Sequence, residues 1–161
     1  MPESVTSIGK RTFQNTQISQ ISLPTGITLI DDYAFYETQL TELVLPDAVE
    51  VVGDYAFFGA PIKTVQLSSA LTSIGREAFK GSEIRDIVFG PAMVSIGDRA
   101  FDSNLIKSIN VPATMQNIGQ YAFYKNPITE INFEEAHLNI GNYAFAENQL
   151  LDLDFPATIK T

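Results

Sequence analysis

The sequence predicts a solenoid, a stack of similar turns, and two observations carry that prediction. Phenylalanine recurs every 22 residues along the 161-residue chain, with no slip in register. An aliphatic residue stands five positions before each of these phenylalanines, and alanine directly precedes six of the seven. A fixed period in the range of about 20–50 residues indicates a repeat solenoid, in which each turn packs on its neighbours. The seven positions are Phe13, Phe35, Phe57, Phe79, Phe101, Phe123 and Phe145.

The first element of each repeat is the pattern Ile-Gly-x-x-Ala-Phe. Glycine follows the aliphatic residue in six of seven copies, and Asp31 takes its place in the second. We expect a short helical or 3₁₀ turn here, in which glycine supplies a positive φ or a close backbone approach. Aspartate tolerates a positive φ better than most residues, which fits Asp31 in that slot. The small alanine indicates a crowded position, so we expect the phenylalanines to form one continuous buried column, the phenylalanine spine.

The second element is a short strand with the pattern Leu-x-x-Ile-x-Leu, which begins five residues after each phenylalanine. Its alternation of apolar and polar residues is typical of a strand with one buried face. Proline follows in four repeats and ends the strand, because it has no N–H to donate. We expect these strands to form a parallel sheet on the concave side of about seven turns. An extended return then leads to the next Ile-Gly turn.

Two columns of the repeat carry polar residues near the core. The position three after the phenylalanine holds Asn104, Asn126 and Asn148 in the last three repeats, and we expect them to bond to loop backbone within the turn. The return has an apolar column in which the only histidine, His137, stands. A buried imidazole without a partner is costly. We therefore favour a local shift that turns Leu138 inward over a tolerated His137 in the core.

The amino-acid composition excludes several classes of binding partner and site. The net charge of −9 argues against binding a nucleic-acid backbone or an anionic membrane surface. There is no cysteine, and thus no disulfide frame or thiolate metal site. The sequence has no run of 18 apolar residues and no signal-peptide pattern at its start. Because both ends fall within a repeat, we expect residues 1–161 to be a single domain taken from a longer protein.

The repeat resembles the BspA-like, or Treponema pallidum-type, leucine-rich repeats. The resemblance is carried by Leu40-Thr41-Glu42-Leu43-Val44-Leu45-Pro46 and then Val52-Gly53-Asp54-Tyr55-Ala56-Phe57, and it covers nearly the whole chain. The repeat is one residue shorter than is usual there, and asparagine replaces a frequent cysteine. The resemblance implies a right-handed solenoid used for protein–protein contact. It also implies a secreted or surface-bound protein of bacteria or some protists, linked to adhesion.

The candidate binding surface is the solvent side of the predicted strands. An ordinary solvated face is the alternative, since no aromatic anchor stands there. Lys63, Arg85 and Lys107 stack on three consecutive turns and could contact an acidic partner. We favour instead a solvated edge in which these cations pair with Glu83 and Asp86. The candidate protein-contact residues are Glu42, Lys63, Arg85, Asp86, Lys107, Glu130, Asp152 and Asp154.

Adjacent carboxylates raise the question of catalysis or metal binding. Glu130 and Asp152 should be neighbours on consecutive turns, as in a glycosidase pair or a hard-cation site. An open sheet face offers no pocket to shift a pKa or exclude water, and no nucleophile–base set can be assembled. We therefore expect no enzyme activity, no cofactor and no metal.

The tyrosines gather in two columns of the turn, two residues before and one residue after the phenylalanine. Exposed, they would form an interface or a glycan-stacking patch. We favour half-buried packing between turns with the hydroxyl in water. The six are Tyr33, Tyr36, Tyr55, Tyr121, Tyr124 and Tyr143.

The sequence thus predicts a non-enzymatic protein-interaction module. Adhesion to a host extracellular-matrix or cell-surface protein is the favoured function. The alternative is a spacer that displays another domain and has no ligand of its own. Terminal turns without capping units would also leave open strand edges, so we expect the isolated chain to be able to associate end to end.

Overall fold

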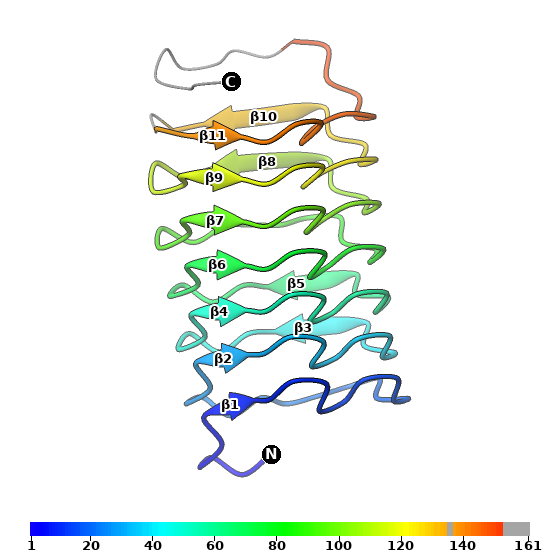
Figure 1. Ribbon diagram of the computed structural model, residues 1–161, viewed down its shortest axis with the longest axis vertical. Helices are drawn as coiled ribbons and strands as arrows, with labels where there is room; N and C mark the ends of the chain where they lie inside the picture. Colours follow the sequence, from blue (N-terminus) through cyan, green and yellow to red (C-terminus); the bar gives the residue numbers. More distant parts are fainter. Residues whose placement is uncertain (135–136, 153–161) are drawn as a thin grey trace.

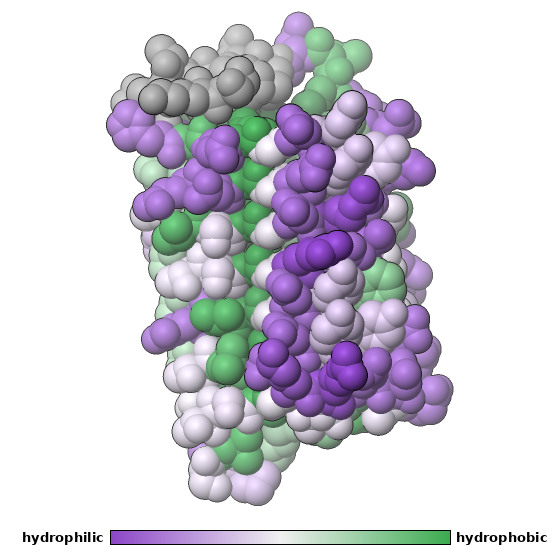
Figure 2. Space-filling model, in the orientation of Figure 1, coloured by the Kyte–Doolittle hydropathy of each residue, from purple (hydrophilic) through white to green (hydrophobic). Residues whose placement is uncertain are grey.

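The structure is a computed structural model that describes residues 1–134 and 137–152. It is a nearly straight stack of turns, and the N-terminus lies at one end (Figure 1). The space-filling view in the same orientation shows a column of hydrophobic residues along the stack beside a strip of hydrophilic ones (Figure 2). The described residues form eleven short parallel strands and no helix. No helix able to cross a membrane is therefore present in that part of the chain.

The longest sheet runs along the return segments, not along the Leu-x-x-Ile-x-Leu segments. Each of its strands contains the aliphatic residue before the Ile-Gly turn and pairs in parallel with a strand 22 residues away, as in Ile8 with Ile30. Six steps between seven strands give about six complete turns rather than seven. The strands, in spatial order, are β1 (Ser7–Ile8), β2 (Leu29–Ile30), β4 (Val51–Val52), β6 (Ser73–Ile74), β7 (Ser95–Ile96), β9 (Asn117–Ile118) and β11 (Asn139–Ile140).

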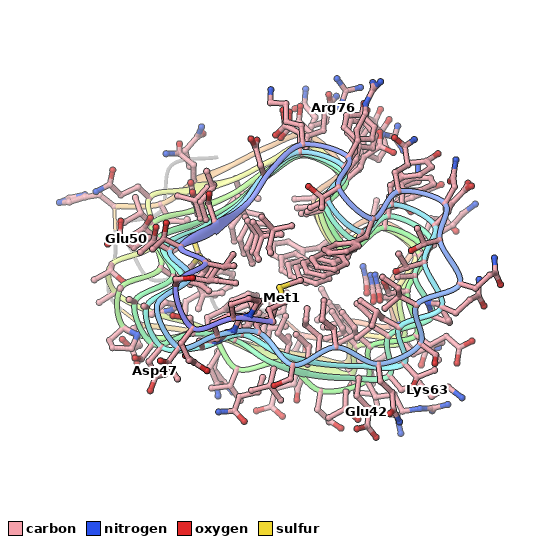
Figure 3. All side chains as sticks on the ribbon, turned by 90° about the horizontal axis from the view of Figure 1, so that it is seen from below. Met1, Glu42, Asp47, Glu50, Lys63 and Arg76 are labelled. Atoms are coloured by element: carbon pink, nitrogen blue, oxygen red, sulfur yellow. The ribbon has the colours of Figure 1, made fainter. Side chains whose placement is uncertain are left out.

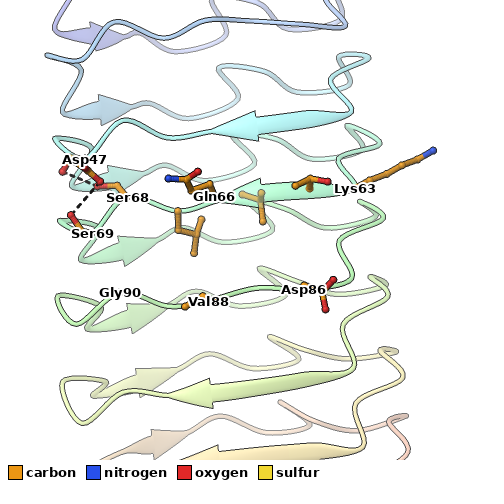
Figure 4. Close-up of a pocket in the computed structure, with 11 residues that line it drawn as sticks. Asp47, Lys63, Gln66, Ser68, Ser69, Asp86, Val88 and Gly90 are labelled. Carbon is orange, nitrogen blue, oxygen red and sulfur yellow. Dashed lines mark hydrogen bonds between the residues drawn. The ribbon is translucent and has the colours of Figure 1, made fainter.

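The Leu-x-x-Ile-x-Leu segments form two separate pairs of strands. β3 (Glu42–Val44) pairs with β5 (Thr64–Gln66), and β8 (Ser108–Val111) pairs with β10 (Glu130–Phe133). The expected continuous sheet on this side is thus wrong. A ladder needs strands about 4.8 Å apart, and the chain at residues 86–88 lies farther from β5 than β3 does (Figure 4). No backbone hydrogen bond joins residues 85–89 to β5 or β8.

The Ile-Gly-x-x-Ala-Phe segment is a turn rather than the expected helical or 3₁₀ element. The residue two before the phenylalanine has a positive φ in every repeat, for example 57° at Tyr55. This conformation points backbone N–H groups at the next turn instead of closing a helix. Tyr55 N donates to the Arg76 carbonyl at 2.8 Å, and Phe57 N donates to the Ala78 carbonyl at 2.8 Å. The backbone ladder therefore continues around the turn.

The glycine after the aliphatic residue lets the backbones of two neighbouring turns approach closely, which confirms one of the two roles expected for it. A Cβ on Gly75 would lie 2.5 Å from the carbonyl carbon of Gly53, and one on Gly97 would lie 2.6 Å from the Arg76 nitrogen. The positive φ expected in this slot is wrong, including at Asp31, because the left-handed residues lie elsewhere in the repeat. Consecutive turns touch backbone to backbone here.

The phenylalanine spine fills the centre of the stack, as predicted. Neighbouring rings lie 5.1–5.4 Å apart with planes within 18° of parallel. The five rings from Phe35 to Phe123 are fully buried, and the end members Phe13 and Phe145 are partly buried. The alanines that precede the five rings are buried as well. Figure 3, viewed along the stack, shows side chains filling the interior of every turn.

The favoured shift at the histidine is confirmed. His137 is exposed, and Leu138 is only 2% exposed. In the preceding repeats the inward position is held by Leu71, Met93 and Met115, all fully buried. One residue of slip moves the imidazole into water and keeps the apolar column intact.

Close approach at glycine gives a first prediction. Gly97→Ala should lower the free energy of unfolding by about 2–4 kcal/mol, because the new methyl group meets the backbone of the preceding turn. Gly81→Asn is the control, since Gly81 has a φ of +71° with open space around it. Asn15, at the same position of the first repeat, already adopts a φ of 57°. Urea denaturation compares the two. Equal losses would contradict the close-approach explanation.

Candidate functional site

The predicted contact residues share one exposed surface, which we call the sheet face. It is the solvent side of the Leu-x-x-Ile-x-Leu segments. Glu42 in β3, Glu130 in β10 and Asp86 between them are exposed, while the residues that follow them, Leu43, Ile131 and Ile87, are buried. Asp152 is also exposed, and Asp154 lies outside the described residues. The inward–outward alternation of the segment is therefore as predicted, although its sheet is interrupted.

The stacked cations of the sheet face are exposed, and one of them has an acidic partner. Lys63 Nζ lies 3.7 Å from Glu83 Oε2. Among the described residues, neither Arg85 nor Lys107 forms an ion pair, and Asp86 forms none either. The interpretation as a paired, solvated edge thus holds for Lys63 with Glu83 only.

The carboxylates of the sheet face do not converge on a metal site. Glu130 accepts a hydrogen bond from Asn132 Nδ2 at 3.0 Å, and the same amide donates to Asn110 Oδ1 at 3.1 Å. Within residues 1–134 and 137–152, no group of three or more histidine or acidic side chains is placed to hold a metal ion. Glu130, Asn132 and Asn110 present hydrogen-bonding groups to solvent on two neighbouring turns.

A shallow depression of about 480 Å³ lies on the sheet face where β5 is not paired with residues 85–89 (Figure 4). Lys63 and Asp86 line one end, and Asp47, whose carboxylate accepts from Ser69 Oγ at 3.3 Å, lines the other. Val88 lies between them and is 79% exposed. The sequence did not reveal this depression, because it arises from the missing ladder.

Buried asparagines bridge the later turns. The Oδ1 of Asn126 accepts from the Ile106 N–H at 3.1 Å, and its Nδ2 donates to the Phe101 carbonyl at 2.8 Å. Asn104 and Asn148 make the same pair of bonds to the turn before each of them. The expected bonding to loop backbone is confirmed, and it joins adjacent turns as well as positions within one turn.

The junction beneath the depression lacks such a bridge. We call the junction between residues 62–67 and 84–89 the seam. The residue in the asparagine column there is Ser82, and its hydroxyl is buried without a hydrogen-bond partner. The seam also lacks the backbone ladder that joins β3 to β5. It is therefore held mainly by the spine, the turn and the seven-stranded sheet.

The tyrosines pack on one another across turns. Tyr33 stacks on Tyr55 at 4.8 Å, and Tyr36 stacks on Phe58 at 4.9 Å. Arginine covers the outer ring faces, with the Arg11 guanidinium 5.1 Å from the Tyr33 centroid. The favoured half-buried packing is thus confirmed for these rings. Tyr143, by contrast, is 62% exposed, so the half-buried packing does not extend to the last tyrosine of its column.

Burial has an electrostatic consequence for these tyrosines. It raises the pKa of Tyr36 and Tyr55, and the nearby carboxylates of Glu37 and Glu77, respectively, raise it further. Because the folded state favours the neutral phenol, the associated stability is present below the usual phenol pKa. It is lost as the pH rises through the folded pKa.

Sequence reasoning missed a set of carboxylates in the turns. Asp102 is 3% exposed and lies 3.1 Å from Arg99 Nη1 and 3.5 Å from Lys80 Nζ. Asp32 lies 2.9 Å from Lys10 Nζ, and this hydrogen bond holds the pKa of Asp32 below its usual value. The pair stabilises the fold above the unfolded carboxyl pKa, and its contribution is lost as the pH falls through the folded pKa. Opposite charges about one repeat apart were the available signal.

The stacked parallel turns, the phenylalanine spine and the Leu-x-x-Ile-x-Leu face define a leucine-rich-repeat solenoid. A comparison with protein families matches the BspA-type leucine-rich repeat region, in six copies, over residues 1–104 and 50–161. The chain therefore belongs to the BspA-type leucine-rich repeat family. A search of curated proteins found no match.

Three solved structures share the fold. The pneumococcal vaccine antigen PcpA is 21% identical with a TM-score of 0.65, over 99% of this chain and 50% of that one. A leucine-rich cell surface protein from Faecalibacterium prausnitzii is 20% identical with a TM-score of 0.67, over 95% and 42%. The T. pallidum leucine-rich repeat protein is 21% identical with a TM-score of 0.59, over 91% and 83%. This chain thus spans about half of the antigen's length.

The asparagine bridges give a second prediction. Asn126→Ala should lower the free energy of unfolding by about 2–4 kcal/mol, because it leaves the buried Ile106 N–H and Phe101 carbonyl without their partner. Ser82→Ala is the matched control in the same column and should cost almost nothing, because it removes a hydroxyl that has no partner. Chemical denaturation measures both. A larger loss at Ser82 would overturn this account of the column.

Proposed function

We propose that this chain is a non-enzymatic protein-binding module that contacts its partner through the sheet face. The carrying observation is that the candidate residues within the described part of the chain project to solvent on one surface from several consecutive turns. A surface built this way presents many side chains at fixed spacing, as solenoids do when they bind proteins. The ring stacks leave the turn side less suited to this role.

We infer adhesion to a host extracellular-matrix or cell-surface protein as the biological role, exerted by a secreted or surface-bound bacterial protein. Family membership supports the general class of interaction or surface module. The fold likeness to a pneumococcal antigen and to a bacterial cell surface protein is consistent with that location for the parent protein. The competing proposal is a spacer that displays another domain and has no saturable ligand.

The test is binding to immobilised extracellular-matrix and serum proteins at physiological salt. A sheet-face variant carries Arg85→Glu, Asp86→Lys, Lys107→Glu and Glu130→Lys. Its net charge is unchanged, because two charges of each sign are reversed. It should lose saturable binding, because the contacts are local and directional.

A turn-side variant is the control, with Arg11→Glu, Glu37→Lys, Lys125→Glu and Glu147→Lys, all exposed positions. It should bind like the unmodified chain. Binding that survives in the sheet-face variant would move the site to the turn side. No saturable binding to any protein on the panel would favour the spacer.

A further inference from the structure

The cations of this chain are confined to part of each repeat. In six consecutive repeats, the stretch from the first exposed residue of the sheet face to the aliphatic residue before the Ile-Gly turn contains no lysine or arginine. The same stretches contain seven acidic residues. They are residues 20–30, 42–52, 64–74, 86–96, 108–118 and 130–140.

In space the described residues of these stretches form one continuous side of the stack, here called the acidic side. It comprises the sheet face from its first exposed column, the corner at the prolines and the seven-stranded sheet. Figure 3 shows Glu42, Asp47 and Glu50 following one another around this side, with Arg76 across the stack from Glu42. All three acids are exposed. A partner that meets this side encounters these carboxylates, and it meets cations only along the edge where Lys63 stands beside Glu42 (Figure 3).

These carboxylates have no cationic partner within the described residues. The six ion pairs found there involve the carboxylates of Asp32, Glu77, Glu83 and Asp102, all outside the acidic side. Asp86 and Glu130, by contrast, are exposed and form no ion pair. Every ion pair within the described residues therefore lies outside the acidic side, although some turn-side acids, such as Glu37 and Glu147, are also exposed and form no ion pair.

The depression at the seam adds an apolar contact to this charge pattern. Val88 is 79% exposed within it, and Val44, 60% exposed, stands in the same column two repeats earlier. Asp47 and Asp86 line the depression on either side of Val88, and Lys63, whose ammonium lies 3.7 Å from Glu83, also lines it at the Asp86 end. The backbone N–H groups of residues 85–89 make no hydrogen bond to protein backbone.

We propose that the acidic side takes a basic, extended protein segment that anchors an aliphatic side chain on Val88 and places lysine or arginine against Asp47 and Asp86. This inference rests on the proposed function and specifies the chemistry of the partner. Carboxylates on both sides of an exposed valine match a segment in which cationic and aliphatic residues alternate. Complementary charge would also speed association and reject acidic segments.

The experiment measures fluorescence anisotropy of three labelled ten-residue peptides at physiological salt. They alternate valine with lysine, valine with glutamate, and glycine with lysine. The valine–lysine peptide should bind saturably and at least about fivefold more tightly than either of the others, because it alone supplies both the charge and the apolar contact. Equal binding of the glycine–lysine peptide would contradict the anchor at Val88. Equal binding of the valine–glutamate peptide would contradict the basic partner.

Matched variants separate local contacts from net charge. Asp47→Asn with Asp86→Asn removes the two charges that line the depression, and Glu37→Gln with Glu147→Gln removes two from the turn side. The first variant should weaken binding about fivefold and the second less than twofold. Val88→Ser should weaken it about fivefold with no change in charge. Equal loss in both charge variants would show attraction by net charge alone and overturn the proposal.

The two experiments distinguish failure of the basic-segment inference from failure of the proposed binding function. If matrix or serum proteins bind through the sheet face while no peptide binds, the basic-segment inference fails and the binding module stands. If the valine–glutamate peptide binds and Val88→Ser abolishes that binding, the surface is correct and the partner's charge is wrong. If nothing binds this side in either experiment, both proposals fail.

Discussion

The stacking of one phenylalanine on the next is the contact on which the rest of the structure depends. No turn of this chain can bury its own apolar side chains, so stability comes from the interface between turns. Fully buried rings 5.1–5.4 Å apart fix the step of the stack at its centre. The glycines then let the backbones touch on the return side. The distance between turns is thus fixed at the spine. On the sheet face, the spacing of neighbouring turns then decides which segments pair as strands.

The two sides of the solenoid differ because of how their polar groups are satisfied. On the turn side, carboxylates such as Asp102 meet cations of the same or neighbouring turn, and tyrosines cover one another. On the acidic side, Glu42 and Asp86 project outward without such partners, and the ladder is interrupted at the seam. The surface with unmatched charge and unpaired backbone is the one that we assign to a partner.

The sequence predicted the fold and the spine because a strict repeat makes one inference valid in every turn. It also predicted the exposed columns and the inward turn of Leu138. It did not predict the seam, because the repeat pattern is the same in every turn and does not show which neighbouring turns lie close enough for their backbones to pair. The positive φ at residues such as Tyr55 was missed because tyrosine rarely signals that conformation. Likewise, the ion pairs of Asp102 depend on side-chain direction rather than on spacing alone.

The central claim is that contacts between turns at the spine hold the molecule together, and the most direct measurement is the stability of Phe101→Ala. Phe101 is fully buried between Phe79 and Phe123. We predict a loss of about 3–5 kcal/mol in the free energy of unfolding, from lost burial plus a cavity. Val88→Ala, on the exposed sheet face, should change it by less than about 0.5 kcal/mol. A loss below about 1 kcal/mol at Phe101 would contradict the account, because an interior spine ring would then contribute little to the stack.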